Sequence, residues 1–175
     1  MSSDPLSDRV RARVRDVPDY PQAGVTFRDI TPLLADGPLF AEVVQALAAA
    51  APPVDLVAGM EARGFLLGAP VAIALGVGFV PIRKEGKLPR AVLSGSYDLE
   101  YGSAVLEVHQ DAVAHGERVL VIDDVLATGG TAAATVELLR QAGAQVAGMS
   151  FLMELLALEG RAKLSGVPVE AMLTY

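Results

Sequence analysis

Residues 119–131 read Val-Leu-Val-Ile-Asp-Asp-Val-Leu-Ala-Thr-Gly-Gly-Thr. The apolar start predicts a buried strand, 119–122, and the small residues at the end open a helix predicted over 130–142. Asp123 and Asp124 follow the predicted strand directly. Because ligands in open α/β sheets bind beyond the carboxyl ends of the strands, we expect both carboxylates to lie in a ligand site.

The segment 127–131 has the composition of a phosphate-binding loop. Its backbone amides face the positive end of the predicted helix, and Gly129 and Gly130 let the backbone close around a phosphate without side-chain collision. The loop lacks the lysine and the glycine spacing of a Walker A motif, and the partial Gly-x-Gly at 76–78 precedes a predicted strand instead of following one. The sequence therefore predicts a sugar-phosphate site.

Outward from this motif, apolar runs of strand length alternate with segments of helical period. This pattern is typical of a doubly wound α/β fold, a mostly parallel sheet with flanking helices. Strands are expected at 54–58, 78–82, 119–122, 146–152 and 167–173, and helices at 7–15, 38–50, 64–75 and 130–142. Two alternating stretches, 91–97 and 103–108, predict a projecting hairpin that could serve as a lid over about 88–108.

Composition limits the remaining possibilities. The 175 residues suit a single domain, 1–175, and the absence of cysteine excludes disulfides and thiolate metal sites. A net charge of −7 argues against a nucleic-acid partner, so an anionic ligand would have to be met by the local basic cluster Arg83, Lys84, Lys87 and Arg90. No apolar run is long enough to span a membrane and no signal peptide is evident, so we expect no membrane partner and a cytoplasmic location.

The strand, the acidic pair and the Thr-Gly-Gly-Thr loop resemble the signature of the type I phosphoribosyltransferases. Further segments resemble the adenine phosphoribosyltransferases in particular, and they occur in that family's order. These segments are Tyr-Pro-Gln-Ala-Gly-Val-Thr-Phe-Arg-Asp-Ile-Thr-Pro (20–32), Gly-Met-Glu-Ala-Arg-Gly-Phe (59–65), Ile-Arg-Lys-Glu-Gly-Lys-Leu-Pro (82–89) and Tyr-Asp-Leu-Glu-Tyr-Gly (97–102). The resemblance implies an N-terminal helix and purine-binding hood over about 1–35. It also implies transfer of the phosphoribosyl group of phosphoribosyl pyrophosphate to adenine, giving AMP and pyrophosphate.

The resemblance also implies roles for individual residues. Ribose and its 5-phosphate would be bound by Asp123, Asp124, Ala127, Thr128, Gly129, Gly130 and Thr131. Pyrophosphate would be bound by Glu61, Ala62, Arg63, Arg83, Lys84 and Lys87, with a cis peptide between Glu61 and Ala62. Adenine would be bound by Val25, Thr26, Phe27 and Arg28, with Phe27 stacked on the base and Leu126 opposite. Without the resemblance, Phe27 would be assigned to the core.

Catalysis is expected to use Arg63 and Glu100, with Glu100 as the acid or base for the purine ring proton and Tyr101 closing over the site. The resemblance implies that Mg²⁺ arrives with the substrate near Asp123 and Asp124, without permanent protein ligands. It also implies a homodimer, with leucine-rich segments near 39–47 and 151–158 as candidate contacts.

Two alternatives stay open at this point. One is an enzyme of the same fold that uses a 6-oxo purine, which the 25–28 hood disfavours. The other is a non-catalytic regulator that binds phosphoribosyl pyrophosphate, although the chain shows no added DNA-binding domain. The arm at 89–96 and Ser103 depart from some relatives, which affects only the expected lid contacts.

Overall fold

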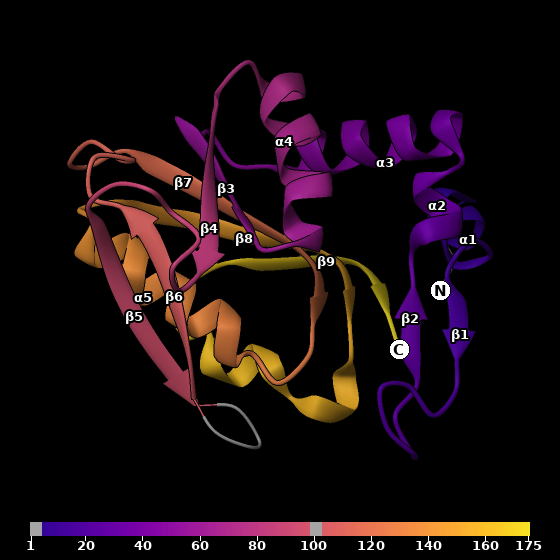
Figure 1. Cartoon of the computed structure of the whole chain (residues 1–175). Coiled ribbons are helices and arrows are strands. Elements are labelled where there is room, and N and C mark those ends of the chain that lie inside the picture. Colours follow the sequence, from indigo (N-terminus) through magenta and orange to yellow (C-terminus); the bar gives the residue numbers. More distant parts are fainter. Residues whose placement is uncertain (1–4, 99–102) are drawn as a thin grey trace. The chain divides into compact units, whose positions relative to one another are not determined.

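The computed structural model describes residues 5–98 and 103–175. The chain forms two compact units, residues 1–47 and 48–175, and the boundary falls inside helix α3 (Gly37–Ala50) (Figure 1). The single domain predicted from length stays a prediction. The fold class is confirmed as a mainly parallel α/β sheet with flanking helices.

The larger unit is built on one sheet. Over the described residues, this sheet has seven strands in the order β5-β6-β4-β3-β7-β8-β9. The neighbours β3, β4, β7, β8 and β9 pair in parallel, whereas β6 pairs antiparallel with both β4 and β5. The strand bounds are β3 (Leu56–Met60), β4 (Gly78–Lys84), β5 (Val92–Asp98), β6 (Ser103–His109), β7 (Arg118–Leu126), β8 (Gln145–Glu154) and β9 (Val169–Thr174).

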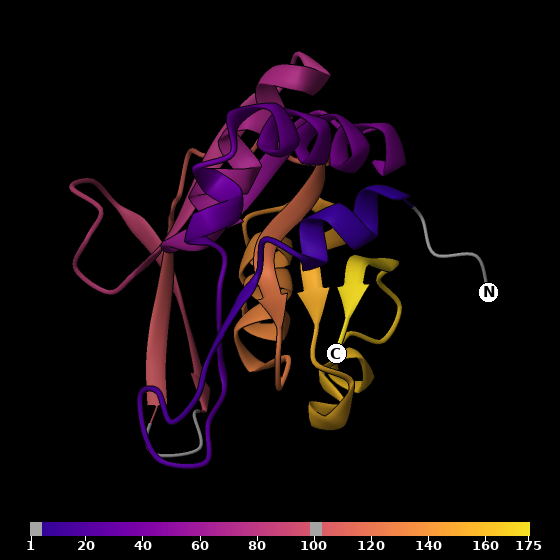
Figure 2. The same cartoon turned by 90° about the vertical axis from the view of Figure 1, so that its right-hand side faces the viewer.

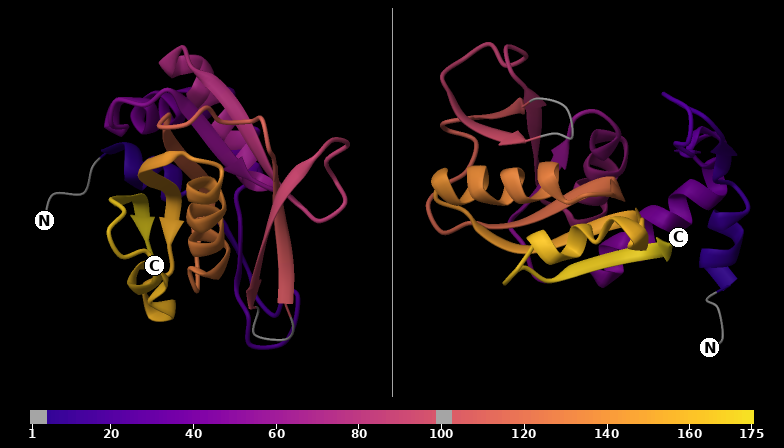
Figure 3. Two further views of the ribbon diagram at one scale, coloured as in Figure 1. Left: turned by 90° about the vertical axis from the view of Figure 1, so that its left-hand side faces the viewer. Right: turned by 90° about the horizontal axis from the view of Figure 1, so that it is seen from below.

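Two helices cross between parallel strands of this sheet. Helix α4 (Arg63–Leu75) joins β3 to β4 and packs on β3 and β7, and α5 (Gly130–Gln141) joins β7 to β8 and packs on β5, β6 and β8. Figure 3 shows α5 lying along the sheet. Helix α4 ends at Gly76, whose φ of 71° closes the helix in the left-handed conformation that glycine adopts without strain.

The strand order reverses between β3 and β7. The chain proceeds from β3 to β4 on one side of this pair, and from β7 to β8 and β9 on the other. Such a reversal leaves a crevice at the carboxyl ends of the two strands, where ligands bind in open α/β sheets. Strands β3 and β7, which lead to the crevice, are fully packed in the core, because Val57, Ala58, Val121 and Ile122 are all 0% exposed.

The hairpin predicted from 91–97 and 103–108 is confirmed. Strands β5 and β6 pair in register from Val92 opposite His109 to Asp98 opposite Ser103. Figure 2 shows them as a long two-stranded ribbon. Its role as a lid over about 88–108 stays a prediction.

The smaller unit contains short elements before α3. These are α1 (Pro5–Arg11), β1 (Arg15–Val17), β2 (Phe27–Asp29) and α2 (Thr31–Leu34). Strands β1 and β2 pair antiparallel, with Val17 opposite Phe27. The Asp29 carboxylate accepts hydrogen bonds of 2.9 Å from the amide and from the hydroxyl of Thr31, the first residue of α2, in an Asx turn before the helix.

Two predicted boundaries were wrong by four residues, and the others differ by two residues or fewer. The helix expected at 7–15 ends at Arg11, because residues 15–17 pair with β2 as a strand. The strand expected at 119–122 continues to Leu126, because β8 pairs with it as far as Glu154. In both cases a pairing partner distant in sequence decides the local structure.

Candidate active site

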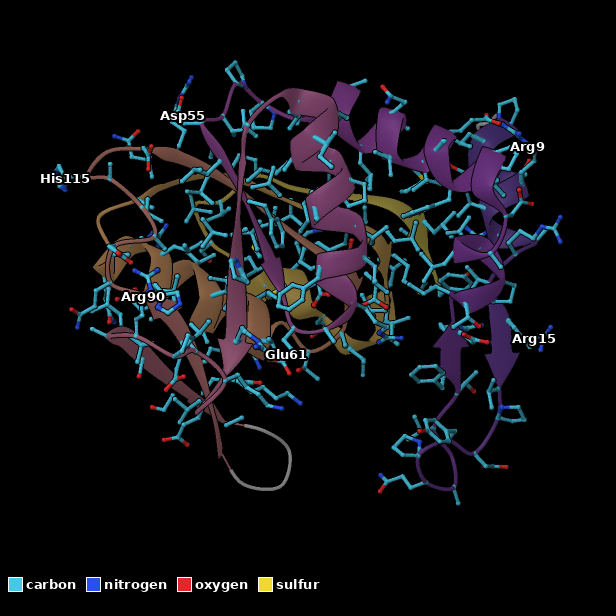
Figure 4. All side chains as sticks on the ribbon, turned by 45° about the horizontal axis from the view of Figure 1, so that its top comes forward. Arg9, Arg15, Asp55, Glu61, Arg90 and His115 are labelled. Atoms are coloured by element: carbon cyan, nitrogen blue, oxygen red, sulfur yellow. The ribbon has the colours of Figure 1, made fainter. Side chains whose placement is uncertain are left out.

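The first part of the site is the turn that follows β3. The peptide bond between Glu61 and Ala62 is cis, as predicted, and Arg63 begins α4 immediately afterwards. The amide of Glu61 donates to the carbonyl of Ile82 at 2.9 Å, which ties the turn to β4. Figure 4 shows Glu61 and Asp55 at opposite ends of β3, so the turn lies at the carboxyl end.

Two glycines bring the turn close to β7. A Cβ at Gly64 would lie 2.7 Å from the Ile122 carbonyl oxygen, and a Cβ at Gly59 would lie 2.7 Å from the Gly64 carbonyl oxygen. Neither position has room for a side chain. The places of Gly59 and Gly64 on either side of residues 60–63 are the sequence signal for this close approach, which was not predicted.

The acidic pair lies inside β7, not beyond its end. Asp124 is 3% exposed, and its amide donates to Oδ1 of Asp123 at 2.9 Å. Burial raises the pKa of Asp123 well above its ordinary value, and the adjacent charge of Asp124 raises it further. Burial also raises the pKa of Asp124, although the Arg63 guanidinium opposes that shift. Because burial disfavours the ionised form of these carboxyls, a positive charge placed beside the ionised pair would be stabilised.

Arg63 and Asp124 connect the two strand ends. Nε of Arg63 lies 2.9 Å from Oδ2 of Asp124, an ionic contact in which the N–H is not aligned as a hydrogen bond. The Arg63 side chain is 37% exposed while that of Asp124 is 4% exposed. The Arg63 side chain therefore contacts a buried carboxylate while more than a third of its surface is exposed to solvent.

The loop after β7 encloses a small cavity. The cavity has a volume of about 80 Å³ and is lined by Met60, Asp123, Val125 and residues 126–132. About 10–15 Å³ of such space holds one water molecule, so the cavity has room for a small polar group such as a tetrahedral anion. The loop passes through Gly129, which has φ of 76°, into the N-terminus of α5. A phosphate in this cavity would face the positive end of the helix.

The basic cluster is organised by carboxylates. Oε2 of Glu61 accepts hydrogen bonds from Nε of Arg83 at 3.2 Å and from the amide of Lys84 at 3.1 Å. Burial would raise the pKa of Glu61, but the hydrogen bonds from Lys84 and Arg83 outweigh it and the pKa is lowered. Arg83 also donates to the carbonyl of Lys87 at 3.1 Å. The Glu61 carboxylate therefore holds residues 83–87, the basic loop, in place, and the predicted role of Glu61 in pyrophosphate binding stays a prediction.

The predicted basic cluster gains a carboxylate partner, Glu107, and loses one of its members, Arg90. Glu107 on β6 is 7% exposed and accepts from the Gly86 amide at 3.0 Å, which links the hairpin to the basic loop. Arg90 pairs instead with Asp111 at 2.5 Å and lies apart from Glu61 in Figure 4. The role of Glu107 could not be found from sequence, because an alternating strand position carries no sign of its partner.

The predicted purine-binding residues fall in different units. Phe27 and Arg28 belong to β2, where the Phe27 ring meets Tyr20 edge-on at 5.3 Å and Arg28 forms an ion pair with Asp16. Val25 is 37% exposed, and its carbonyl accepts from the Tyr20 amide at 3.1 Å. Leu126 belongs to the larger unit and lines the small cavity. Glu100 and Tyr101 lie outside the described residues.

Neither a metal cluster nor a membrane span stands out in residues 5–98 and 103–175. Within these ranges, no three His, Cys, Asp or Glu side chains are grouped as metal ligands. No helix in the same ranges is both long and apolar enough to cross a membrane.

A small loop cavity at the reversal of strand order, next to an acidic pair of which Asp124 is buried and near Arg63 at the start of α4, defines the class of phosphoribosyltransferases. Comparison with known proteins agrees, because the family described as phosphoribosyl transferase domain matches residues 34–165. An adenine phosphoribosyltransferase of Streptomyces coelicolor is 58% identical over 175 residues, which cover 97% of this chain and 96% of that protein. One of Thermobifida fusca is 55% identical, with 99% of each chain covered.

Solved structures give the same result. The adenine phosphoribosyltransferase of Thermoanaerobacter pseudethanolicus superposes with a TM-score of 0.94 at 46% identity, covering 97% of this chain and 99% of that one. That of Saccharomyces cerevisiae, solved with an imino-altritol bisphosphate and adenine, has a TM-score of 0.91 at 39% identity and covers 95% and 98%. The chain belongs to the adenine phosphoribosyltransferase family.

Proposed function

We propose that this chain transfers the phosphoribosyl group of phosphoribosyl pyrophosphate to adenine, producing AMP and pyrophosphate. The observation that carries the proposal is the Asp123–Asp124 pair, of which Asp124 is buried, beside a small cavity in the loop after β7, in a chain whose relatives are adenine phosphoribosyltransferases. The reaction salvages a purine base. The same relatives favour adenine over a 6-oxo purine, and favour an enzyme over a regulator.

The site residues have separate tasks in this proposal. Residues 127–131 bind the 5-phosphate through backbone amides and hydroxyls, and the two carboxylates accept from the ribose hydroxyls. As the bond from the anomeric carbon to pyrophosphate lengthens, positive charge develops on the ribose, and Asp123 and Asp124 stabilise it. Arg63, with Arg83, Lys84 and Lys87, stabilises the negative charge that develops on pyrophosphate.

Mg²⁺ fits this donor set as a partner of the substrate. The ion keeps several waters and binds through one or two carboxylates together with substrate phosphates. Asp123 and Asp124 are the carboxylates at hand, and no larger ligand cluster is found among the described residues. When bound, the ion would supply charge stabilisation to the departing pyrophosphate.

Adenine recognition and proton transfer are assigned to the residues that the family resemblance indicates. We assign stacking to Phe27, contacts to the base to Val25, Thr26, Arg28 and Leu126, and the acid or base role to Glu100. Phe27 and Arg28 lie on a short paired strand, a suitable support for a recognition segment. A site that hydrogen-bonds an exocyclic amine rejects a 6-oxo purine, since its buried groups would stay unpaired.

A homodimer remains part of the proposal. Of its predicted contact segments, Leu39, Leu47 and Leu152 are buried within the single chain, whereas Leu156 and Leu158 are 54% and 47% exposed and remain candidates. Leu66 and Ile73 of α4 are also 47% and 82% exposed, on one face of an apolar helix. This face supports a contact between copies. The cytoplasmic location stays a prediction.

The test measures AMP formation from adenine and phosphoribosyl pyrophosphate, with and without Mg²⁺, beside hypoxanthine and guanine. We expect Mg²⁺-dependent turnover confined to adenine and sharply reduced in Glu100→Ala. Asp111→Asn, which changes an exposed carboxylate paired with Arg90, serves as the control of equal charge change. Absence of turnover with any purine, despite binding of phosphoribosyl pyrophosphate, would contradict the enzyme assignment and favour the regulator.

A further inference from the structure

The predicted phosphate-binding loop, residues 127–131 (the phosphate loop), lies against a second backbone segment. No sequence motif identifies this second segment. Strands β7 and β8 run side by side as far as Leu126 and Glu154, and the amide of Leu155 then donates to the Leu126 carbonyl at 2.9 Å. Beyond this point β7 enters the phosphate loop. The chain after β8 enters two short 3₁₀ turns, η1 (Leu156–Leu158) and η2 (Gly160–Lys163).

The two segments touch backbone to backbone at Gly129 and Gly160. A Cβ at Gly160 would lie 2.1 Å from the carbonyl oxygen of Ala127 and 2.8 Å from the amide nitrogen of Gly129. A Cβ at Gly129 would in turn lie 2.2 Å from the Gly160 carbonyl oxygen. Since all these neighbours are backbone atoms, no side-chain rotation could relieve either clash.

The need for glycine at position 160 comes from this contact alone. Gly129 adopts φ of 76°, a conformation that favours glycine in any surroundings. Gly160 does not have a left-handed φ, so alanine there would suffer no backbone strain. The absence of a side chain at Gly160 therefore allows the backbone of the phosphate loop to lie in contact with it.

Arg161 anchors the segment behind the loop. Its Nε and Nη2 donate to the two carboxylate oxygens of Glu154 at 3.1 and 2.5 Å, and its Nη1 donates to the Val169 carbonyl at 2.5 Å. Glu154 is 4% exposed, so this bidentate pair is shielded from water on the carboxylate side. The Leu156 amide also donates to the Tyr175 carbonyl at 2.9 Å, which ties the turn to the end of β9.

We propose that Gly160 and Arg161 are positioning residues for the 5-phosphate site. Gly160 supports the backbone of Ala127 and Gly129, and Arg161 fixes Gly160 against the end of the sheet. The cavity lining contains no residue of 155–165, so this segment lies behind the loop and acts through it. The inference rests on the proposed function, because it assigns the cavity to the phosphate of the phosphoribosyl donor.

Gly160→Ala tests the contact. To move the new Cβ from 2.1 Å to the 3.0 Å minimum seen for such atoms, the loop must shift by about 0.9 Å. A misplacement of about 1 Å can reduce a rate about 100-fold. We expect kcat/KM for phosphoribosyl pyrophosphate to fall on the order of 100-fold, mainly through KM, and the affinity for ribose 5-phosphate to fall in parallel. Affinity for inorganic pyrophosphate, bound by the basic loop, should stay within about twofold of the wild type.

Gly148→Ala on β8 is the matched control, because a Cβ there meets only ordinary contacts of 3.6 Å or more. Arg161→Lys is the second variant. It keeps the charge but loses the planar fork, so we expect a smaller loss in the same KM and the same unchanged pyrophosphate affinity. If Gly160→Ala does not fold, Arg161→Lys still decides the question.

The binding measurements separate this inference from the proposed function. A wild-type protein that binds ribose 5-phosphate but makes no AMP contradicts the function, while loss of that binding in the variants still supports the positioning role. Wild-type affinity for ribose 5-phosphate in both variants overturns the positioning role, whatever the activity. So does an equal loss of ribose 5-phosphate and pyrophosphate affinity, since that outcome reports a general loss of structure.

Discussion

Nε of Arg63 lies 2.9 Å from Oδ2 of Asp124, so an arginine after β3 is in ionic contact with a buried carboxylate on β7. This contact crosses the point where the strand order reverses. It joins the part of the site assigned to pyrophosphate to the part assigned to ribose. An anion that draws Arg63 outward would leave Asp124 with less compensation at the moment when positive charge develops on the ribose.

Replacement of Arg63 should therefore affect both stability and catalysis. In Arg63→Gln, Asp124 stays buried without the guanidinium that lowers its pKa. We expect a loss of about 1–2 kcal/mol in unfolding free energy, reduced from the cost of a fully buried pair because Arg63 is 37% exposed. The loss should be larger at pH 8 than at pH 5, since it requires an ionised Asp124. Urea unfolding at both pH values checks this, and a pH-independent loss would contradict the pairing.

Asp123→Asn should stabilise the protein and remove its activity. The folded-state pKa of Asp123 is raised, so the contribution of this group to stability is fully present below 3.8 and is lost as pH rises through the folded pKa. Asparagine mimics the neutral carboxyl and keeps an acceptor for the Asp124 amide. We expect a gain of about 1–3 kcal/mol at neutral pH that disappears near pH 4, with kcat reduced at least about 100-fold. Thermal unfolding against pH checks the gain, and lower stability at neutral pH would refute it.

Glu61→Gln should loosen the basic loop. The substitution removes the charge that accepts from Arg83 Nε and the Lys84 amide. We expect KM for phosphoribosyl pyrophosphate to rise roughly tenfold, because charge-assisted hydrogen bonds contribute about 1.5–3 kcal/mol each. Glu85→Gln is the matched control, since Glu85 is an exposed carboxylate in the same loop. Equal effects of the two substitutions would show that net charge alone matters.

Asp55→Asn should lower stability without changing catalysis. Asp55 accepts from Arg118 at the opposite end of β3 from Glu61, and these hydrogen bonds lower its pKa to about 2. The stabilisation is fully present above the ordinary pKa of 3.8 and is lost as pH falls toward 2. The variant should melt below the wild type at pH 7, with the difference shrinking as pH falls below 4, and kcat should be unchanged. A change in kcat would show that this end of the sheet is coupled to the site.

The sequence was sufficient for features with a local cause. The apolar run before Asp123, the alternating stretches around 98–103 and the glycine after α4 each determine their structure through neighbouring residues. The extension of β7 to Leu126 and the strand at 15–17 were missed, because each depends on a distant pairing strand. The role of Glu61 in pyrophosphate binding stays a prediction, and the hydrogen bonds from Arg83 and Lys84 to its carboxylate were not predicted, because these partners lie about 20 residues away in the sequence.

The contact between Gly129 and Gly160 has a consequence for redesign. Two bare backbones in contact leave no side chain that could be trimmed to let the loop move toward the turn after β8. An insertion in the loop after β7 would have to be matched by a change in that turn. A variant that gains space by moving this part of the loop therefore requires coordinated changes in two segments about 30 residues apart in the sequence.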